Sequence, residues 1–297
     1  MSTSQAGILA DLPDLSRYLE FNRLPDCNPA PVLRDLAARK LGAEMVIGLG
    51  SGLVSSLKGT VPGMRAFPSM SGPGVEVPST QADIWCWIRG TDRGEITHLS
   101  RSVTAQVSTA FRRSRLIDGF KFDVSRKIGR DLGGYEDGTE NPDGDDAVQA
   151  AIAQGAGAGI DGSSFVGVQK WVHDLDHFQS LSEDDRDNIF GRHVSDNEEF
   201  DEAPESAHVK RTAQESFDPE AFVVRRSMPW SDESGEGLVF VSFGKSFDAF
   251  EAQLRRMTGQ EDGITDGLFR FTRPVSGSFF WCPPVIGDTL DLSAIGL

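Results

Sequence analysis

The stretch Gly133-Gly134-Tyr135-Glu136-Asp137-Gly138-Thr139-Glu140-Asn141-Pro142 (residues 133–142) separates two runs of predicted strands and helices. It combines three glycines, a proline and three carboxylates in ten residues. Neither a helix nor a strand tolerates that mixture, so we predict a loop with a demanding backbone. An Asp between glycines can approach a ligand closely, because glycines carry no side chain that blocks the approach. Taken alone, the stretch also fits an acidic surface turn.

The composition is that of an acidic globular protein. The chain has 297 residues, enough for one large domain or two ordinary ones, and a formal net charge of −16. That charge argues against binding to nucleic acid or to anionic lipid surfaces. The cysteines at 27, 86 and 282 form no CxxC motif and suit a reducing compartment. Because no signal peptide or transmembrane run is apparent, we predict a cytoplasmic location.

Before the loop, the hydrophobic pattern predicts the order strand, helix, strand, strand, helix, strand. The strands are expected over residues 17–24, 45–53, 83–89 and 115–122, and the helices over 30–41 and 96–111. Residues 59–80 contain four prolines among glycines and serines, so they are expected to form a long irregular loop.

After the loop, the same order approximately repeats. Strands are expected over 163–173, 221–228, 237–244, 268–272 and 277–281, and helices over 145–154, 175–190 (with a cap at Ser182) and 248–257. Residues 221–228 and 237–244 are expected to form a hairpin. This order is the split βαβ pattern. We therefore predict an α+β fold of two ferredoxin-like domains, residues 1–142 and 143–297, each with a four-stranded antiparallel sheet and helices packed on it.

Two kinds of polar residue could carry chemistry. His208 follows an acidic segment, although a lone histidine is more often structural; His173 and His177 are poorly spaced as metal ligands. Arg225 and Arg226 are adjacent in an apolar strand, so one of them should face the interior. A buried Arg needs a carboxylate or an anionic ligand as its partner. With a loop Asp it would form either a functional polar pair or a structural salt bridge.

The pattern GxxDGTENP over residues 134–142 resembles the signature of the dye-decolourising (DyP-type) haem peroxidases. His208 follows Asp137 by 71 residues and Arg225 follows after a further 17, in the order that the family uses. Segments 190–192, 237–240 and 269–277 are also similar to the family, and the compact length resembles its bacterial B-type subgroup. The resemblance covers nearly the whole chain.

This resemblance implies two ferredoxin-like domains and one haem b per chain, held mainly by the second domain. It implies a peroxidase that reduces hydrogen peroxide and oxidises aromatic donors such as dyes and phenolics. His208 would be the proximal iron ligand, and Asp266 its hydrogen-bond partner, with Asp262 as the fallback. Such a carboxylate gives the imidazole more imidazolate character, which favours cleavage of the O–O bond.

The resemblance also assigns the remaining site residues. Asp137 and Arg225 would lie on the distal side, the first moving a proton and the second stabilising charge; which of them dominates stays open. Ser227 would stand where some members carry Asn, with a hydroxyl that can still donate a hydrogen bond. Arg192 would pair with a haem propionate, and Phe240 would lie beside the cofactor.

Several alternatives accompany this interpretation. The chain could bind or deliver haem with little turnover. The acidic turn could instead bind Ca²⁺, although its spacing does not fit an EF-hand; its oxygen ligands would be Asp137, Glu140, Asn141, Asp143, Asp145 and Asp146. Candidate electron relays are Trp171, Trp230, Trp281 and Tyr135, though buried aromatics usually belong to the core. We expect a homo-oligomer. The tail, 288–297, is interpreted as a terminal segment rather than a dimer contact or a peptide that docks to an encapsulin shell.

Overall fold

The computed structural model describes residues 2–57, 59–125 and 129–297 of the chain. In the first half, the helices are α1 (Ala6–Leu9), α2 (Ala30–Ala37), α3 (Ser51–Ser56) and α4 (Arg93–Val107). The strands there are β1 (Leu15–Arg23), β2 (Met45–Gly50), β3 (Met70–Gly72), β4 (Val75–Val77), β5 (Ile84–Gly90) and β6 (Phe111–Phe120).

In the second half, the strands are β7 (Ser164–His173), β8 (Val224–Arg225), β9 (Met228–Asp232), β10 (Gly235–Gly244), β11 (Thr272–Pro274), β12 (Ser278–Cys282), β13 (Val285–Ile286) and β14 (Thr289–Leu290). The α-helices are α5 (Gly144–Ala151), α6 (Leu175–Ser180), α7 (Glu183–Phe190), α8 (His208–Arg211) and α9 (Asp248–Met257). Three short 3₁₀ helices complete it: η1 (Gln214–Ser216), η2 (Gly267–Arg270) and η3 (Ser293–Ile295).

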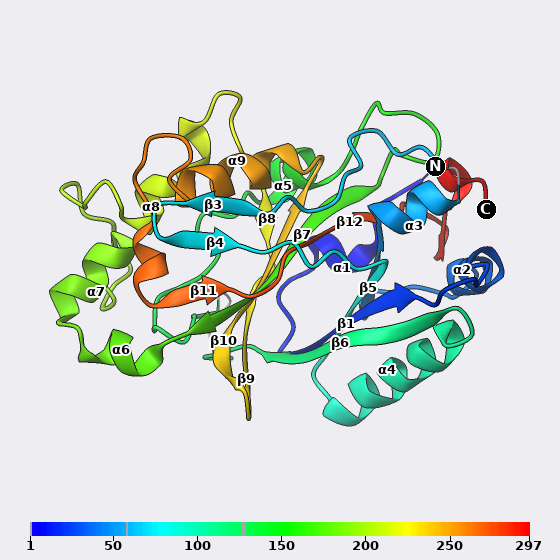
Figure 1. Ribbon diagram of the computed structural model, residues 1–297, viewed down its shortest axis with the longest axis horizontal. Coiled ribbons are helices and arrows are strands. Elements are labelled where there is room, and N and C mark those ends of the chain that lie inside the picture. Colours follow the sequence, from blue (N-terminus) through cyan, green and yellow to red (C-terminus); the bar gives the residue numbers. More distant parts are fainter. Residues whose placement is uncertain (1, 58, 126–128) are drawn as a thin grey trace.

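The two halves share one sheet. Its ten strands have the order β11-β7-β12-β2-β5-β1-β6-β9-β10-β8, and β7 also pairs with β10. The strands from β7 round to β10 therefore form a closed ring, in which β6 meets β9 at the pair Gly119 and Trp230. In Figure 1, α4 lies along the β1 and β6 side of the molecule, whereas α9 lies on the opposite side, above β10. The result is a mixed fold of strands and helices, in agreement with the coarse prediction.

Strand β5 shows why the centre of this sheet is apolar. Its residues Ile84, Trp85, Cys86 and Trp87 are all fully buried, so both faces of the strand are covered. Trp85 stacks on Phe280 of β12, with ring centroids 6.1 Å apart. Aromatic contacts of this kind connect the first half of the chain to the second.

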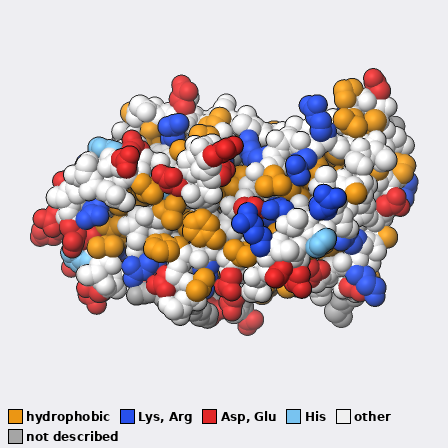
Figure 2. Space-filling model, turned by 90° about the horizontal axis from the view of Figure 1, so that it is seen from below, with side chains coloured by type: hydrophobic (Ala, Val, Ile, Leu, Met, Phe, Trp, Pro, Cys, Tyr) orange, Lys and Arg blue, Asp and Glu red, His pale blue; other side chains and the backbone are white. Residues whose placement is uncertain are grey.

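Helix α7 begins as its sequence predicts. Ser182 Oγ accepts a hydrogen bond from the Asp185 backbone N–H (3.1 Å), which confirms the expected cap. The first turn carries Glu183 and Asp184, which suit the positive end of the helix dipole. Figure 2 shows acidic side chains gathered at this end of the molecule, where Figure 1 places α6 and α7.

Four predictions in the first half were wrong in detail. The helix expected over 30–41 ends at Ala37. The expected strand 45–53 ends at Gly50, and α3 follows because Leu53 and Val54 turn into the core. The expected loop 59–80 contains the β3–β4 hairpin. The helix expected to reach residue 111 ends at Val107, because Phe111 pairs with Arg23 of β1 and begins β6.

Two predictions in the second half need correction in detail. The predicted hairpin is present, since Val224, Arg225 and Met228 pair with β10. Its turn lies later than expected, because β9 contains Pro229, which lies opposite Leu238, and the turn follows Asp232. The Asp232 carboxylate accepts the Ser234 N–H there (2.7 Å). The strand expected over 268–272 is mostly η2, because Asp266 caps that turn at the Leu268 N–H.

The C-terminal tail packs against the body of the protein. Its residues form β14 and η3, and Leu290, Leu292 and Ile295 are buried. Thr3, near the other end of the chain, pairs with Val285 of β13. These contacts suit the interpretation of the tail as a terminal segment; a role in docking or dimerisation stays a prediction.

Candidate active site

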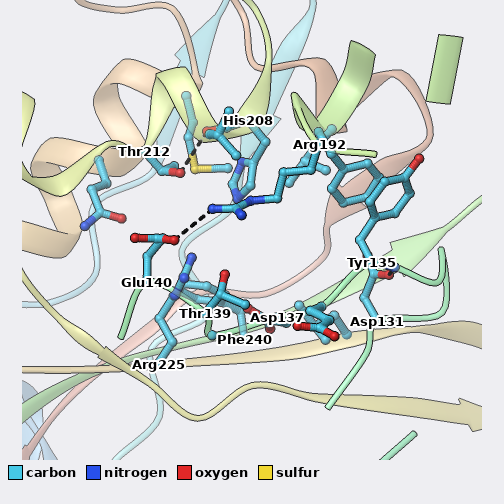
Figure 3. A pocket seen from close by; sticks show the side chains of 18 of the residues that line it. Asp131, Tyr135, Asp137, Thr139, Glu140, Arg192, His208, Thr212, Arg225 and Phe240 are labelled. Atoms are coloured by element: carbon cyan, nitrogen blue, oxygen red, sulfur yellow. Dashed lines mark hydrogen bonds and ion pairs between the residues drawn. The ribbon is translucent and has the colours of Figure 1, made fainter. Parts of the chain in front are cut away.

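A cavity of about 240 Å³ lies between the loop 129–142, β7, α8 and α9. In Figure 3, His208 enters from one side, whereas Asp137 and Arg225 lie on the other. Arg192 also lines it. The apolar part of its wall includes Leu238, Phe240, Phe250, Leu254, Met257, Leu268 and Phe271. An apolar cavity with a few convergent polar groups is typical of a binding site for a small molecule or cofactor.

The backbone of the loop explains its glycines. Gly134 and Gly138 have φ angles of +95° and +100°, which favour glycine over residues with a side chain. The Asp137 N–H donates to the Gly129 carbonyl (3.0 Å), which anchors the loop beside the cavity. Asp137 itself lines this cavity and a second, adjacent one. The loop prediction is therefore confirmed, and the interpretation as a simple surface turn is wrong.

Arg225 is held by its backbone rather than by a salt bridge. Asn141 donates to the Arg225 carbonyl (3.0 Å) and accepts the Arg225 N–H (2.8 Å). Within the described chain, no ion pair involves the Arg225 guanidinium, and its buried Nε has no partner. The structural salt bridge considered from the sequence is therefore absent there. An arginine side chain that lies beside a cavity and has no ionic partner is suited to binding an anionic or polar ligand.

Arg226, its neighbour, has a structural role. Its guanidinium donates to the backbone carbonyls of Leu9 (3.1 Å), Ala10 (3.0 Å) and Arg225 (3.1 Å). Burial lowers the pKa of Arg226, while nearby Asp11 opposes that shift. The two arginines thus divide as alternation along a strand predicts, one toward the cavity and the other toward the N-terminal segment.

His208 is paired with a buried carboxylate. Helix α8 begins at His208, and its Nδ1 lies 2.8 Å from Oδ2 of Asp266. The Asp266 side chain is 0% exposed, and its other oxygen caps η2. The predicted contact between His208 and Asp266 is therefore present. The fallback, Asp262, instead makes two 2.8 Å hydrogen bonds with Arg211.

Arg192 lies at the edge of the cavity among carboxylates. Its guanidinium bonds Oε1 of Glu140 (2.9 Å) and also contacts Glu199. A further nitrogen donates to the Asn197 carbonyl (2.9 Å). Figure 3 shows Arg192 reaching toward Glu140 across the cavity. The positive charge predicted for a propionate is thus present, but two acidic side chains already contact it.

Ser227 lies outside this cavity. It lines the second cavity, of about 310 Å³, together with Asp137 and Arg225. Its hydroxyl accepts the Val241 N–H at 3.3 Å. The structure therefore brings Ser227 next to the two residues predicted for the distal side, whereas Phe240 lies in the apolar wall of the first cavity.

Asp131 also lines the cavity, and the sequence analysis missed it. It is 8% exposed, and one of its oxygens accepts the Tyr135 N–H (3.0 Å). Burial, with a smaller contribution from Asp137, raises the pKa of Asp131 to about 7. The sequence offered one signal that Asp131 belongs to the site: it lies two residues before Gly133, in the same turn.

A further group of cavity residues, which the sequence did not bring together, comes from one face of β7. Gln169, Trp171 and His173 alternate along the strand and all line the cavity. Each has a buried side-chain nitrogen with no partner in the described part of the chain. Burial lowers the pKa of His173 to about 4, so this imidazole is neutral near pH 7. The period-two spacing in the strand was a signal for this shared face.

The candidate electron relays separate into two groups. Tyr135 and Trp171 line the cavity. Trp230 is buried beside Trp171, to whose carbonyl its indole N–H donates (2.9 Å). Trp281 is fully buried in the sheet.

The placement of possible metal ligands and the length of the helices bear on the alternatives. Across residues 2–57, 59–125 and 129–297, no group of three or more His, Cys, Asp or Glu side chains is placed to hold a metal ion, so the calcium alternative has no support there. None of the helices in the same ranges has the length and apolarity needed to cross a bilayer.

Comparison with known proteins identifies the family. Residues 129–287 match the family model described as Dyp-type peroxidase, C-terminal. The chain belongs to the Dyp-type peroxidase family. The dye-decolorizing peroxidase of Mycobacterium tuberculosis is 31% identical to this Dyp-type chain over 234 residues, which are 77% of this chain and 68% of that protein. The dye-decolorizing peroxidase of Rhodococcus erythropolis is 28% identical over 292 residues, 96% of this chain and 80% of that protein.

Solved structures extend the similarity to the whole fold. A dye-decolorizing protein from V. cholerae has a TM-score of 0.84 at 26% identity, covering 94% of this chain and 97% of that chain. A variant of DypB from Rhodococcus jostii RHA1, in complex with heme, has a TM-score of 0.85 at 25% identity, covering 95% and 96%. The Dyp-type fold therefore includes both halves of the shared sheet.

Proposed function

We propose that this Dyp-type peroxidase binds one haem b per chain in the first cavity, reduces hydrogen peroxide and oxidises aromatic donors such as dyes and phenolics. The observation that carries the proposal is one cavity with two functional sides. His208, backed by buried Asp266, lies on one side, and Asp137 and Arg225 lie on the other. The names of the curated relatives, and the heme complex of the DypB variant, support the same function.

The residues of the cavity fit a haem. Asp266 hydrogen bonds Nδ1 of His208, and no described group hydrogen bonds Nε2, so Nε2 is the nitrogen that would hold the iron. The apolar wall that includes Phe240 and Leu254 suits the faces of a porphyrin. Arg192 would hold a propionate, in competition with Glu140 and Glu199.

The chain's own residues support peroxide cleavage. Bound haem supplies the iron at which peroxide is reduced and its oxidising equivalents are held. Asp137, in its ionised form, takes a proton from one peroxide oxygen and delivers it to the other, which leaves as water. Arg225 keeps its charge and stabilises the negative charge that develops on the leaving oxygen. Asp266 accepts the Nδ1 proton of His208 in a hydrogen bond and raises the basicity of that imidazole.

We also infer that each half is a ferredoxin-like unit, with the boundary near residue 143. The strand order supports this. In the first half the order is β2-β5-β1-β6, and in the second it is β12-β7-β10-β9. In each set of four, the strands that come first and third along the chain (β1 and β5, β7 and β10) are central, as in a split βαβ arrangement. Membership of the B-type subgroup, homo-oligomerisation, a cytoplasmic location and encapsulin docking stay predictions from the sequence.

One experiment tests the function against haem storage or delivery. Protein reconstituted with haem should show a Soret band that changes on addition of hydrogen peroxide and recovers as an aromatic donor is oxidised. His208→Ala should lose haem, whereas His177→Ala, on the exposed face of α6, should keep it. A stable Soret band with no response to peroxide would favour the binding or delivery alternative. Absence of any Soret band would contradict both.

A further inference from the structure

Tyr135 is placed differently from the other residues of the loop. It is 4% exposed and lines the first cavity, two residues before Asp137. Its ring stacks on Phe190, with centroids 3.8 Å apart and an angle of 14° between the planes. In Figure 3 its phenol oxygen points away from Asp137 and Arg225. The ring therefore contacts the cavity while the hydroxyl reaches another environment.

That environment is a buried carboxylate. The Tyr135 hydroxyl donates to Oδ1 of Asp187 at 2.6 Å. The Asp187 side chain is 7% exposed, and its Oδ2 lies 3.0 Å from Nδ1 of His193, which is 51% exposed. His193 thus holds one oxygen of the carboxylate from the solvent side, and the other oxygen accepts from both the phenol and the Val194 N–H (3.1 Å).

We propose that Tyr135 is a redox-active residue that passes one electron to the peroxide-oxidised cofactor while its phenol proton moves to Asp187. This inference rests on the proposed function, which supplies the oxidant. In the forward step, the O–H bond of Tyr135 breaks, the proton binds Oδ1 of Asp187, and the oxidised haem is reduced by one electron. In the return step, an aromatic donor gives one electron to the tyrosyl radical, and the proton returns from Asp187.

The hydrogen bond makes this step feasible inside the protein. Oxidation of a buried phenol that kept its proton would create an unpaired positive charge, which is costly in an apolar environment. Burial and the Asp187 carboxylate raise the pKa of Tyr135, so the phenol stays protonated until it is oxidised. A carboxylate that already accepts the phenol proton can take it without any movement of heavy atoms.

The chain contains a matched control in its other tyrosine. Only two tyrosines occur in the sequence. Tyr18 is 2% exposed, and its hydroxyl has no hydrogen-bond partner in the described part of the chain. Its ring stacks on Trp87 within the sheet. A tyrosine without a proton acceptor should not form a neutral radical, so the two residues should behave oppositely.

Freeze-quench electron paramagnetic resonance of the haem-loaded protein after addition of hydrogen peroxide tests the proposal. Tyr18→Phe should keep a tyrosyl signal, and ring-deuterated tyrosine should narrow it, which assigns it to Tyr135 without changing that residue. Tyr135→Phe should lose the signal. Asp187→Asn, which keeps an acceptor oxygen but cannot take the proton, should lose most of it while the Soret band is retained.

The outcomes separate the two claims. A normal Soret change with no tyrosyl signal in Tyr18→Phe, or with an undiminished signal in Tyr135→Phe, would overturn the role of Tyr135 alone. An undiminished signal in Asp187→Asn would overturn the role of Asp187 as proton acceptor. A Soret band that does not respond to peroxide in any variant would overturn the proposed function, and the inference with it.

Discussion

Asn141 holds Arg225 from 84 positions away in the sequence, through hydrogen bonds of 3.0 and 2.8 Å to its carbonyl and its N–H. The amide side chain therefore takes the place of a neighbouring strand for one residue of β8. This contact sets where the Arg225 side chain leaves the backbone. The Gly-rich loop thus supplies Asp137 to the cavity and also positions the arginine beside it.

Asn141→Ala should weaken both stability and catalysis. Two hydrogen bonds are lost and the Arg225 N–H is left without its partner, while the Arg225 carbonyl keeps the Arg226 guanidinium, at a cost of about 1–3 kcal/mol in the free energy of unfolding. Urea unfolding and the rate of peroxide consumption check this. Asn28→Ala is the control, because among the described residues Asn28 makes a single, local side-chain hydrogen bond, which it accepts from the Ala30 N–H. Equal behaviour of the two variants would contradict the positioning role.

Arg225→Leu and Arg226→Leu should have opposite effects. Arg225 forms no ion pair in the described ranges, so its loss should leave stability nearly unchanged and slow the reaction with peroxide by about a hundredfold or more. Arg226 donates to three carbonyls, so its loss should cost about 2–4 kcal/mol of stability. Stopped-flow mixing with peroxide and urea unfolding measure the two effects. The assignment fails if Arg226→Leu slows the peroxide reaction more than Arg225→Leu does.

Asp266→Asn should change the cofactor more than the fold. The amide keeps an oxygen to cap η2 but no longer carries the charge beside His208, so activity should fall by about 10- to 100-fold. The midpoint potential of the haem should rise. Asp262→Asn should instead lower stability, because it breaks the pair with buried Arg211. Spectroelectrochemistry distinguishes them; an unchanged potential in Asp266→Asn would exclude the carboxylate–histidine role.

Asp131 should make stability fall as the pH rises. Burial raises its pKa to about 7 from an ordinary value of 3.8, so the folded state holds a proton that the unfolded state releases. The stabilisation is present below pH 4 and is lost as the pH rises through about 7. The Asn side chain does not titrate. The free energy of unfolding of Asp131→Asn, relative to that of the parent protein, should therefore increase as the pH rises from about 4 to about 7. The gain is limited to a few kcal/mol, since one pKa unit is about 1.4 kcal/mol.

Urea unfolding of the haem-free protein at pH 5 and pH 8 measures this difference. Asp137→Asn serves as the comparison and should only slightly reduce the difference between the two pH values, because the Asp137 charge is a smaller cause of the raised pKa of Asp131 than burial. If Asp131→Asn shows the same stability relative to the parent at both pH values, the raised pKa is wrong.

Local patterns in the sequence predicted most of the strands and helices. Helix α9 begins and ends where its spacing of Phe250 and Leu254 places it, and the cap at Ser182 was identified from its residue type. The failures lie where distant contacts decide. Asp266 caps η2, so residues that resemble a strand turn instead. Pro229, which suggests a turn, lies in β9 because β10 pairs beside it.

The candidate site shows the same division. The family pattern supplied Asp137, His208, Arg225 and Asp266, because their order along the chain is informative. Asp187 was not found, since it contacts Tyr135 from 52 positions away and no local pattern links them. The pKa of Asp131 likewise depends on burial by segments that sequence periodicity does not place together.

The shared sheet limits how the catalytic half can be transplanted. The span matched by the family model, residues 129–287, contains Asp137, His208 and Arg225. However, β12 within that span pairs with β2 outside it, and Phe280 stacks on Trp85. A fragment that begins at residue 129 would keep Asp137, His208 and Arg225. However, it would expose to water the apolar side chains of β12, such as Phe280, that pack against the first half. A chimaera that reuses this site therefore also needs the residues before 129, although none of those that the structure describes lines the first cavity.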